Sequence, residues 1–134
     1  MAIQRISYSL LQTHYPECPQ GWLGLLANIL SLIEARYADT GIAFTPAHFT
    51  LHNVQQQFGW MRLHYDSVIN LDDLVDQAAT LSANTCEHCG NAAQLWVYAH
   101  NLHAWCAQHR HAHSQSPAEY RHARKHAICA RKYA

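Results

Sequence analysis

The sequence predicts a small α+β domain, and three observations lead to this class. Apolar residues recur at three- and four-residue steps from Gly21 to Tyr37, which is the period of an amphipathic helix. Apolar and polar residues alternate from Trp60 to Tyr65, which is the period of a half-buried strand. Two pairs of candidate metal ligands follow, with two residues inside each pair: Cys86 and Cys89, then Cys106 and His109. The length of 134 residues suits a single domain.

The N-terminal part is expected to contribute one long helix. Residues 3–13 suit a short helix or a short strand equally, and Pro16 and Pro19 then enforce an irregular segment. The helix that follows carries an apolar stripe that should face the core: Trp22, Leu25, Leu26, Ile29, Leu30, Ile33 and Tyr37. Gly41 is expected to end this helix, because glycine favours the left-handed conformation found at helix C-termini.

A β-hairpin is predicted next. The segment Phe49–Val54 is rich in strand formers, and Gly59 would lie at or beside the turn. A helix through Gln55–Phe58 is the competing interpretation. The second strand would present three polar or aromatic residues on its outer face: Trp60, Arg62 and His64. This face is a candidate partner-binding surface, and an ordinary solvent-facing side of a sheet is the alternative.

A second amphipathic helix should run from Asn70, as its N-cap, to about Ser82. Three acidic residues occupy its first turns: Asp72, Asp73 and Asp76. The helix dipole stabilises negative charge there, and neighbouring carboxylates on a helix point in different directions. We therefore interpret them as helix-start residues and not as a metal-binding cluster.

The two ligand pairs predict a zinc site. Gly90 follows Cys89 and allows a tight knuckle that presents two thiolates to one ion, while Cys106 and His109 supply the other half of a tetrahedron. Zinc prefers this set of soft and borderline ligands, and four protein ligands close the coordination shell, as in structural sites. We expect one structural zinc ion held by Cys86, Cys89, Cys106 and His109. His111 and His113 follow directly, and the sequence leaves open whether either replaces His109 or forms a weak second site.

The residues around this site predict a treble-clef-like zinc module over residues 83–113. Leu95–Tyr98 and Leu102–Trp105 are predicted strands joined by a turn at His100-Asn101. Cys106 and His109 would then lie in the first turn of a helix. His100, Asn101 and His103 resemble a nuclease-like cluster, but the sequence places no obvious carboxylate or general base beside them.

A C-terminal helix is predicted from Ser116 to about Lys132, because Ser116, Pro117 and Glu119 form a capping box. We assign residues 1–110 to the α+β domain and residues 114–134 to a basic helical extension. Residues 1–106 carry about −5 and residues 107–134 about +5, although the whole chain is formally neutral. The extension is either a solvated end or a surface for phosphate or an acidic partner. Its candidate contacts are Arg121, Arg124, Lys125, Arg131 and Lys132.

Cysteine usage and the N-terminal residues predict a cytoplasmic protein. The opening Met-Ala-Ile-Gln-Arg lacks a signal-peptide pattern, and the apolar run from Trp22 to Ile33 is too short to span a bilayer. We expect no membrane partner. Cys18 and Cys129 remain outside the ligand set, and we expect reduced thiols there.

Residues 20–110 resemble a family of small, mostly uncharacterised bacterial and phage proteins with a zinc module. The resemblance rests on Gln57–Tyr65, on Thr85-Cys86-Glu87-His88-Cys89-Gly90, and on Trp105-Cys106-Ala107-Gln108-His109, with Ser82 and Leu95 between them. Gln57 replaces the family's usual lysine, and Trp60 replaces its second glycine. The resemblance implies a zinc-binding protein that is sometimes carried by mobile elements.

These observations favour a non-enzymatic zinc protein that docks on a macromolecular partner. A protein-binding regulator or inhibitor of a host defence or nucleoprotein machine is the preferred hypothesis. A nucleic-acid-binding zinc-finger protein that uses the basic C-terminal helix is the alternative. A treble-clef nuclease is the least favoured, because a catalytic zinc needs an open coordination position. The oligomeric state stays open.

Overall fold

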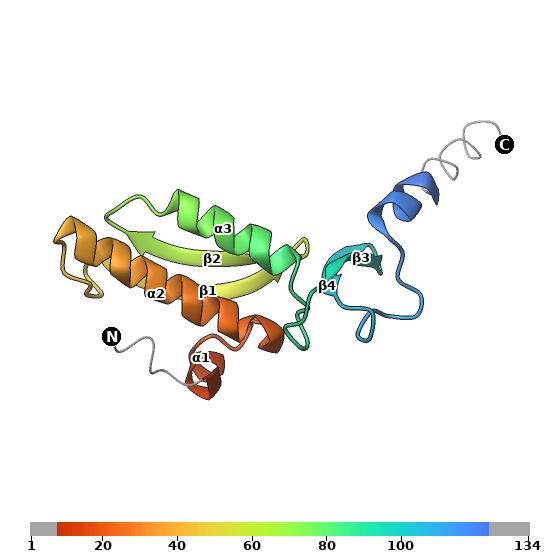
Figure 1. Cartoon of the computed structure of the whole chain (residues 1–134), viewed down its shortest axis with the longest axis horizontal. Coiled ribbons are helices and arrows are strands. Elements are labelled where there is room, and N and C mark those ends of the chain that lie inside the picture. The colour runs from red at the N-terminus through yellow and green to blue at the C-terminus, as the bar shows by residue number, and fades with distance from the viewer. Residues whose placement is uncertain (1–7, 124–134) are drawn as a thin grey trace.

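The computed structural model describes residues 8–123 and shows one α+β domain (Figure 1). The elements in chain order are α1 (Tyr8–His14), the 3-10 helix η2 (Gln20–Trp22), α2 (Leu23–Thr40), β1 (Phe49–Gln57), β2 (Trp60–Ser67), α3 (Asp72–Ala83), β3 (Gln94–Tyr98) and β4 (Asn101–Trp105). A further helix begins at residue 117 and continues to the end of the described residues. The predicted class is confirmed.

The core lies between a layer of two helices and the β1–β2 hairpin. In Figure 1, α2 and α3 lie side by side across one face of this hairpin. Met61 and Leu63 on β2 are buried against the helices, whereas Trp60 and Arg62 are exposed, so the predicted alternation is confirmed. On α2, the buried positions follow the predicted stripe: Leu26, Ile29, Leu30, Ile33 and Tyr37.

The first hairpin closes through a two-residue turn. β1 and β2 pair antiparallel from Phe49↔Ser67 to Gln57↔Trp60, with an irregularity between Leu51 and Asn53. Phe58 and Gly59 form the turn, and both have positive φ, 56° and 87°. Turns of this kind match the twist of the flanking strands. The alternative helix over Gln55–Phe58 is therefore wrong, because its three glutamines pair with β2 and Phe58 lies in the turn.

Helix boundaries follow their local signals with small shifts. The residues left ambiguous near the N-terminus form α1 from Tyr8, and α2 ends at Gly41, which has a φ of 76°. The prediction placed the N-cap of the second long helix at Asn70, which is one residue too early. Leu71 is the N-cap of α3, and Asn70 Oδ1 accepts a hydrogen bond of 2.8 Å from the Asp72 N–H. Among the described residues, no helix has the length and apolar composition that crossing a bilayer requires.

The acidic start of α3 is tied to α2 and not to a metal. Arg36 donates two hydrogen bonds to the Asp73 carboxylate, at 3.0 and 2.7 Å. This bonding lowers the pKa of Asp73 to about 2. The pair joins the two helices across their outer face.

The second hairpin, β3–β4, lies beyond the turn of the first (Figure 1). Its own turn is Ala99 and His100, both with positive φ. The predicted turn at His100-Asn101 is therefore one residue late, because Asn101 pairs with Tyr98 and belongs to β4. The outer edge of β3 is occupied, because Val97 and Gln115 exchange two backbone hydrogen bonds of 2.7 and 2.9 Å.

Candidate metal centre

Four side chains converge where the loop after α3 meets the turn after β4. The Sγ atoms of Cys89 and Cys106 are 3.7 Å apart. His109 Nδ1 lies 3.7 Å from Cys86 Sγ and 3.2 Å from Cys106 Sγ. All four candidate ligand atoms lie within 4.8 Å of one another. The structure thus brings together the four residues that the sequence singled out.

This cluster fits one zinc ion. Zinc–sulfur bonds of about 2.3 Å and zinc–nitrogen bonds of about 2.0 Å place tetrahedral ligand atoms roughly 3.5–3.8 Å apart. Three of the six separations, 3.7, 3.7 and 3.2 Å, lie close to that range, and the other three do not exceed 4.8 Å, so small side-chain shifts would close the cluster around one ion. Three thiolates and one imidazole also match the ligand preference of zinc.

Backbone hydrogen bonds shape both ligand pairs. In the first, the Gly90 N–H donates to Cys86 O at 2.9 Å, and Gly90 has a φ of 80°, which glycine adopts without strain. In the second, the His109 and Arg110 N–H groups both donate to Cys106 O, at 3.2 and 2.9 Å. Each pair is therefore held in position by a local turn.

The second pair does not lie in a helix, which corrects the prediction. Cys106 is followed by a hydrogen-bonded turn, and the next helix begins only at residue 117. The intervening chain folds back instead, because Gln115 pairs with β3 and Arg110 donates to Ser114 Oγ at 3.2 Å. The Ser116 Oγ then accepts a bond of 3.1 Å from the Glu119 N–H, so the predicted cap at Ser116 is confirmed.

The surroundings shift the pKa values of the Cys89 and Cys106 thiols in opposite directions. Burial acts to raise the pKa of Cys106, but hydrogen bonds from the His109 and Gln108 N–H groups and the nearby thiols lower it overall. The Asn91 N–H acts to lower the pKa of Cys89, but desolvation and the neighbouring Cys106 and Cys86 thiols raise it overall. Backbone N–H groups that face sulfur stabilise the thiolate form, which is the form that binds metal.

The additional histidines have other contacts. The His111 ring stacks on Tyr98 with centroids 3.9 Å apart, and its Nδ1 accepts a bond of 3.0 Å from the His113 N–H. Within residues 8–123, the candidate metal cluster contains His109 and neither of these two histidines. The question left open by the sequence is thus answered in favour of His109.

The remaining cysteines take no part in the cluster as far as the structure describes them. Cys18 is a buried free thiol, and burial raises its pKa to about 12. An unreactive, structural role for Cys18 follows. Cys129 lies outside the described residues, so its reduced state stays a prediction.

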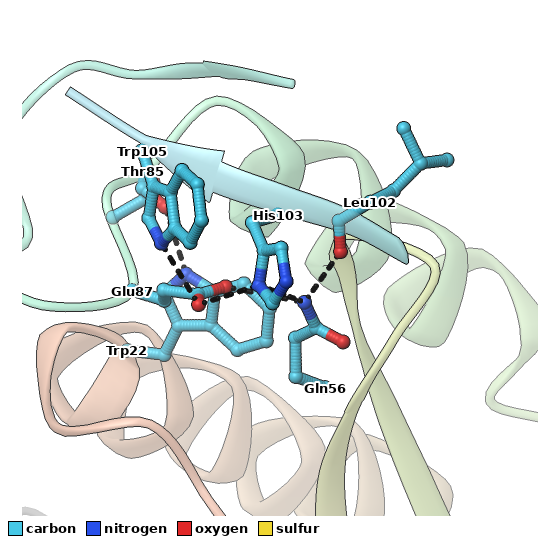
Figure 2. Close-up of polar contacts among 7 residues, drawn as sticks. All are labelled: Trp22, Gln56, Thr85, Glu87, Leu102, His103 and Trp105. Carbon is cyan, nitrogen blue, oxygen red and sulfur yellow. Dashed lines mark hydrogen bonds and ion pairs between the residues drawn. The ribbon is translucent and has the colours of Figure 1, made fainter. Parts of the chain in front are cut away.

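A polar network that the sequence did not predict lies beside the cluster (Figure 2). Glu87, between the first two ligands, accepts a hydrogen bond of 3.1 Å from Trp105 Nε1 and lies 3.1 Å from His103 Nδ1. Gln56 on β1 donates to Glu87 at 3.2 Å and to Leu102 O at 2.7 Å. A carboxylate therefore does lie beside His103, contrary to expectation, and it connects both hairpins to the knuckle.

The 3-10 helix η2, which leads into α2, packs directly on the knuckle. The Gly21 N–H donates to Glu87 O at 2.9 Å. Trp22 Nε1 donates to Thr85 O at 2.8 Å (Figure 2). A Cβ on Gly21 would lie 2.1 Å from Cys86 O, so only glycine fits here. Trp22 is fully buried, which confirms its predicted core role. The sequence contains no local signal for contacts across more than sixty residues.

The structure describes four of the eight predicted partner-binding residues. Trp60 and Arg62 are exposed on β2, while His64 is half-buried and bonded to Gln55 Oε1 at 2.8 Å. Arg121 is exposed on the last helix. The other four basic residues lie outside the described residues: Arg124, Lys125, Arg131 and Lys132. Their role as a contact surface stays a prediction.

Comparisons with family models, curated proteins and solved structures found no match to this chain. The resemblance to small bacterial and phage zinc proteins therefore stays an expectation drawn from the motifs. Function has to be argued from the geometry of the chain itself.

Replacing Glu87 with alanine should weaken the fold without removing the metal. The Trp105 and Gln56 donors would lose their carboxylate partner, which costs about 2–3 kcal/mol for a charged acceptor in a buried network. Metal binding should persist, because Glu87 is not one of the four ligands. Urea denaturation and zinc content measure the two effects. Asp76→Ala, which removes an exposed carboxylate on α3, is the control, and an equal loss in both variants would contradict the role of the network.

Proposed function

We propose that this chain is a non-enzymatic zinc-binding protein that docks on a protein partner as a regulator or inhibitor. One zinc ion would join the two ligand pairs and stabilise the β3–β4 hairpin. The four side chains can fill a tetrahedral shell, which supports a structural and not a catalytic role for the ion. Docking would then depend on a surface outside the metal centre.

The observation that carries this proposal is the backbone strain at Phe58. A bulky residue at positive φ is uncommon, and strained positions of this kind tend to persist where function requires them. Phe58 has a φ of 56° in a turn that favours asparagine or aspartate before glycine. Its side chain is nevertheless 60% exposed, so burial within the fold does not compensate for the strain. An aromatic residue held outward at a turn is suited to entering a pocket of a partner.

The surroundings of Phe58 support the same role. Trp60, 42% exposed, contacts it edge-on with ring centroids 6.4 Å apart. Tryptophan and arginine are common among residues that dominate binding energy, and Arg62 follows on the same face. A Cβ on Gly59 would lie 2.4 Å from the Leu95 side chain, so the turn rests against the second hairpin. We name Phe58, Trp60 and Arg62 the tip surface.

Charge favours a protein over a nucleic acid at this surface. Residues 49–67, which form the hairpin, contain one arginine and no lysine. Nucleic-acid affinity depends largely on clustered cations that neutralise phosphates. Nucleic-acid binding through the basic C-terminal segment stays the alternative, and salt dependence distinguishes the two.

Phe58→Asn should lower the affinity for the partner without lowering the stability of the fold. Asparagine suits the turn, so the free energy of unfolding should stay constant or rise by up to about 1 kcal/mol. Partner affinity should fall by about 2 kcal/mol, roughly thirtyfold, if Phe58 is a central contact. Val68→Asn is the matched control, because Val68 is 57% exposed and follows β2 at the other end of the hairpin.

The partner would first be captured from a bacterial lysate with tagged wild-type protein, with and without nuclease. Titration of the purified partner against each variant then measures affinity at two salt concentrations. Unchanged affinity of Phe58→Asn would overturn the tip surface. Capture that disappears after nuclease treatment, with a steep salt dependence, would favour the nucleic-acid alternative.

A further inference from the structure

The four candidate ligands differ sharply in their access to solvent. Cys86 is 0% and Cys106 8% exposed, whereas Cys89 is an exposed cysteine. Cys89 also borders a surface cavity of about 640 Å³ between the start of α2 and the knuckle. Further residues that line this cavity are Gln12, Gln20, Gly24 and His88. A small polar reagent can therefore approach the Cys89 sulfur, while both other sulfurs are shielded.

A second sulfur of the cluster lies beside the exposed Cys89 sulfur. The Cys106 sulfur lies 3.7 Å from it, close enough to act as a resolving thiol.

We propose that Cys89 is an oxidative modification site, at which a small hydroperoxide such as hydrogen peroxide converts Cys89 and Cys106 to a disulfide and releases the zinc ion. The inference rests on the zinc centre and not on the identity of a docking partner. It adds a chemical reactivity to a cluster that otherwise has only a structural role.

The reaction balances in two steps. The Cys89 thiolate attacks one peroxide oxygen, the O–O bond breaks, and the hydroxide that leaves takes a proton to become water. The Cys106 thiolate then attacks the sulfenic sulfur of Cys89, the S–S bond forms, and the second hydroxide leaves as water. The two sulfurs together lose two electrons, and the peroxide gains them. Zinc keeps only Cys86 and His109 as protein ligands and dissociates.

The test uses the full chain, purified with zinc and freed of reductant. Hydrogen peroxide is added, zinc release is followed with a chromogenic chelator, and disulfides are mapped by mass spectrometry without reduction. Cleavage after Glu87 separates Cys86 from Cys89, and cleavage after Tyr98 separates Cys89 from Cys106. Two proteases with these specificities therefore assign the bond. We expect a Cys89–Cys106 bond that forms in parallel with zinc release.

Two further measurements test the role of the Cys89 thiol directly. Cys89→His retains a zinc ligand without a thiol, and zinc release by peroxide should be at least about tenfold slower than in wild type. If this variant does not fold, limiting iodoacetamide on the wild-type zinc protein should alkylate Cys89 before Cys86 or Cys106. Cys18→Ala is the control and should release zinc at the wild-type rate, because Cys18 is buried outside the cluster.

The outcomes separate this inference from the zinc centre itself. A Cys86–Cys89 bond, zinc release without a disulfide, or release at the wild-type rate in Cys89→His would overturn the modification site alone. Alkylation that starts at Cys86 or Cys106 would do the same. Purified protein that never contains zinc would overturn the metal centre as well. Parallel release and Cys89–Cys106 bond formation, slowed in Cys89→His, would establish the site.

Discussion

Cys106→Ser is expected to remove the metal and unfold the β3–β4 hairpin. Serine binds zinc poorly, and Cys106 supplies the sulfur nearest both Cys89 and His109. Apparent zinc-binding free energies of about 10–16 kcal/mol in small metal-dependent modules are also folding free energy. Local strand propensity does not keep a hairpin with five-residue strands folded without the metal, since isolated hairpins are marginally stable in water.

Elemental analysis should find zinc in the wild-type protein and none in Cys106→Ser, and Cys86→Ser should behave in the same way. Hydrogen exchange should then show loss of protection in residues 94–105, with protection retained on α2. Cys18→Ala, which removes a buried thiol outside the cluster, should keep its zinc. Wild-type protein that lacks zinc and still protects β3 and β4 would rule out the structural role of the metal.

Gly21→Ala should destabilise the protein as strongly as a disruptive core substitution. The added Cβ would lie 2.1 Å from Cys86 O and 2.8 Å from Gly90 N, and these backbone atoms cannot move without opening the knuckle. The hydrogen bond from the Gly21 N–H to Glu87 O would be lost as well. We expect the free energy of unfolding to fall by about 3 kcal/mol, together with weaker zinc binding.

Urea denaturation and zinc competition with a chelator measure the two effects of Gly21→Ala. Gly24→Ala is the matched control, because Gly24 lies in α2 and lines the cavity beside the knuckle. Alanine there should gain up to about 1 kcal/mol from helix propensity. If both variants were as stable as the wild type, the close contact between η2 and the knuckle would be wrong.

Several features could be read from short stretches of sequence. The four candidate metal ligands were identifiable because both pairs have a fixed local spacing, and a tight turn suffices to bring two such residues together. The apolar stripe of α2 and the alternation of β2 were identifiable because each depends only on the period of its own backbone. The capping box at Ser116 is equally local.

Other features depended on how distant segments pack. Whether a helix or a turn follows Cys106 was decided by the pairing of Gln115 with β3, which the residues around Cys106 do not encode. The sequence around Glu87 does not indicate its hydrogen-bond partners. These come from other elements, because Gln56 lies on β1 and Trp105 on β4. Exposure likewise depends on neighbours, so the outward position of Phe58 was not predictable from its residue type.

By itself, the sequence determined which four residues are candidate ligands, the helical and strand periods and the α+β class, because these follow from spacing along the chain. The tertiary structure decided which sulfur is accessible, which glycine has no room for a side chain, and where a carboxylate joins two hairpins. These properties arise from contacts such as that of Gly21 with Cys86, between residues far apart in sequence. Close packing of separate elements creates such contacts, and no local pattern of residues specifies them.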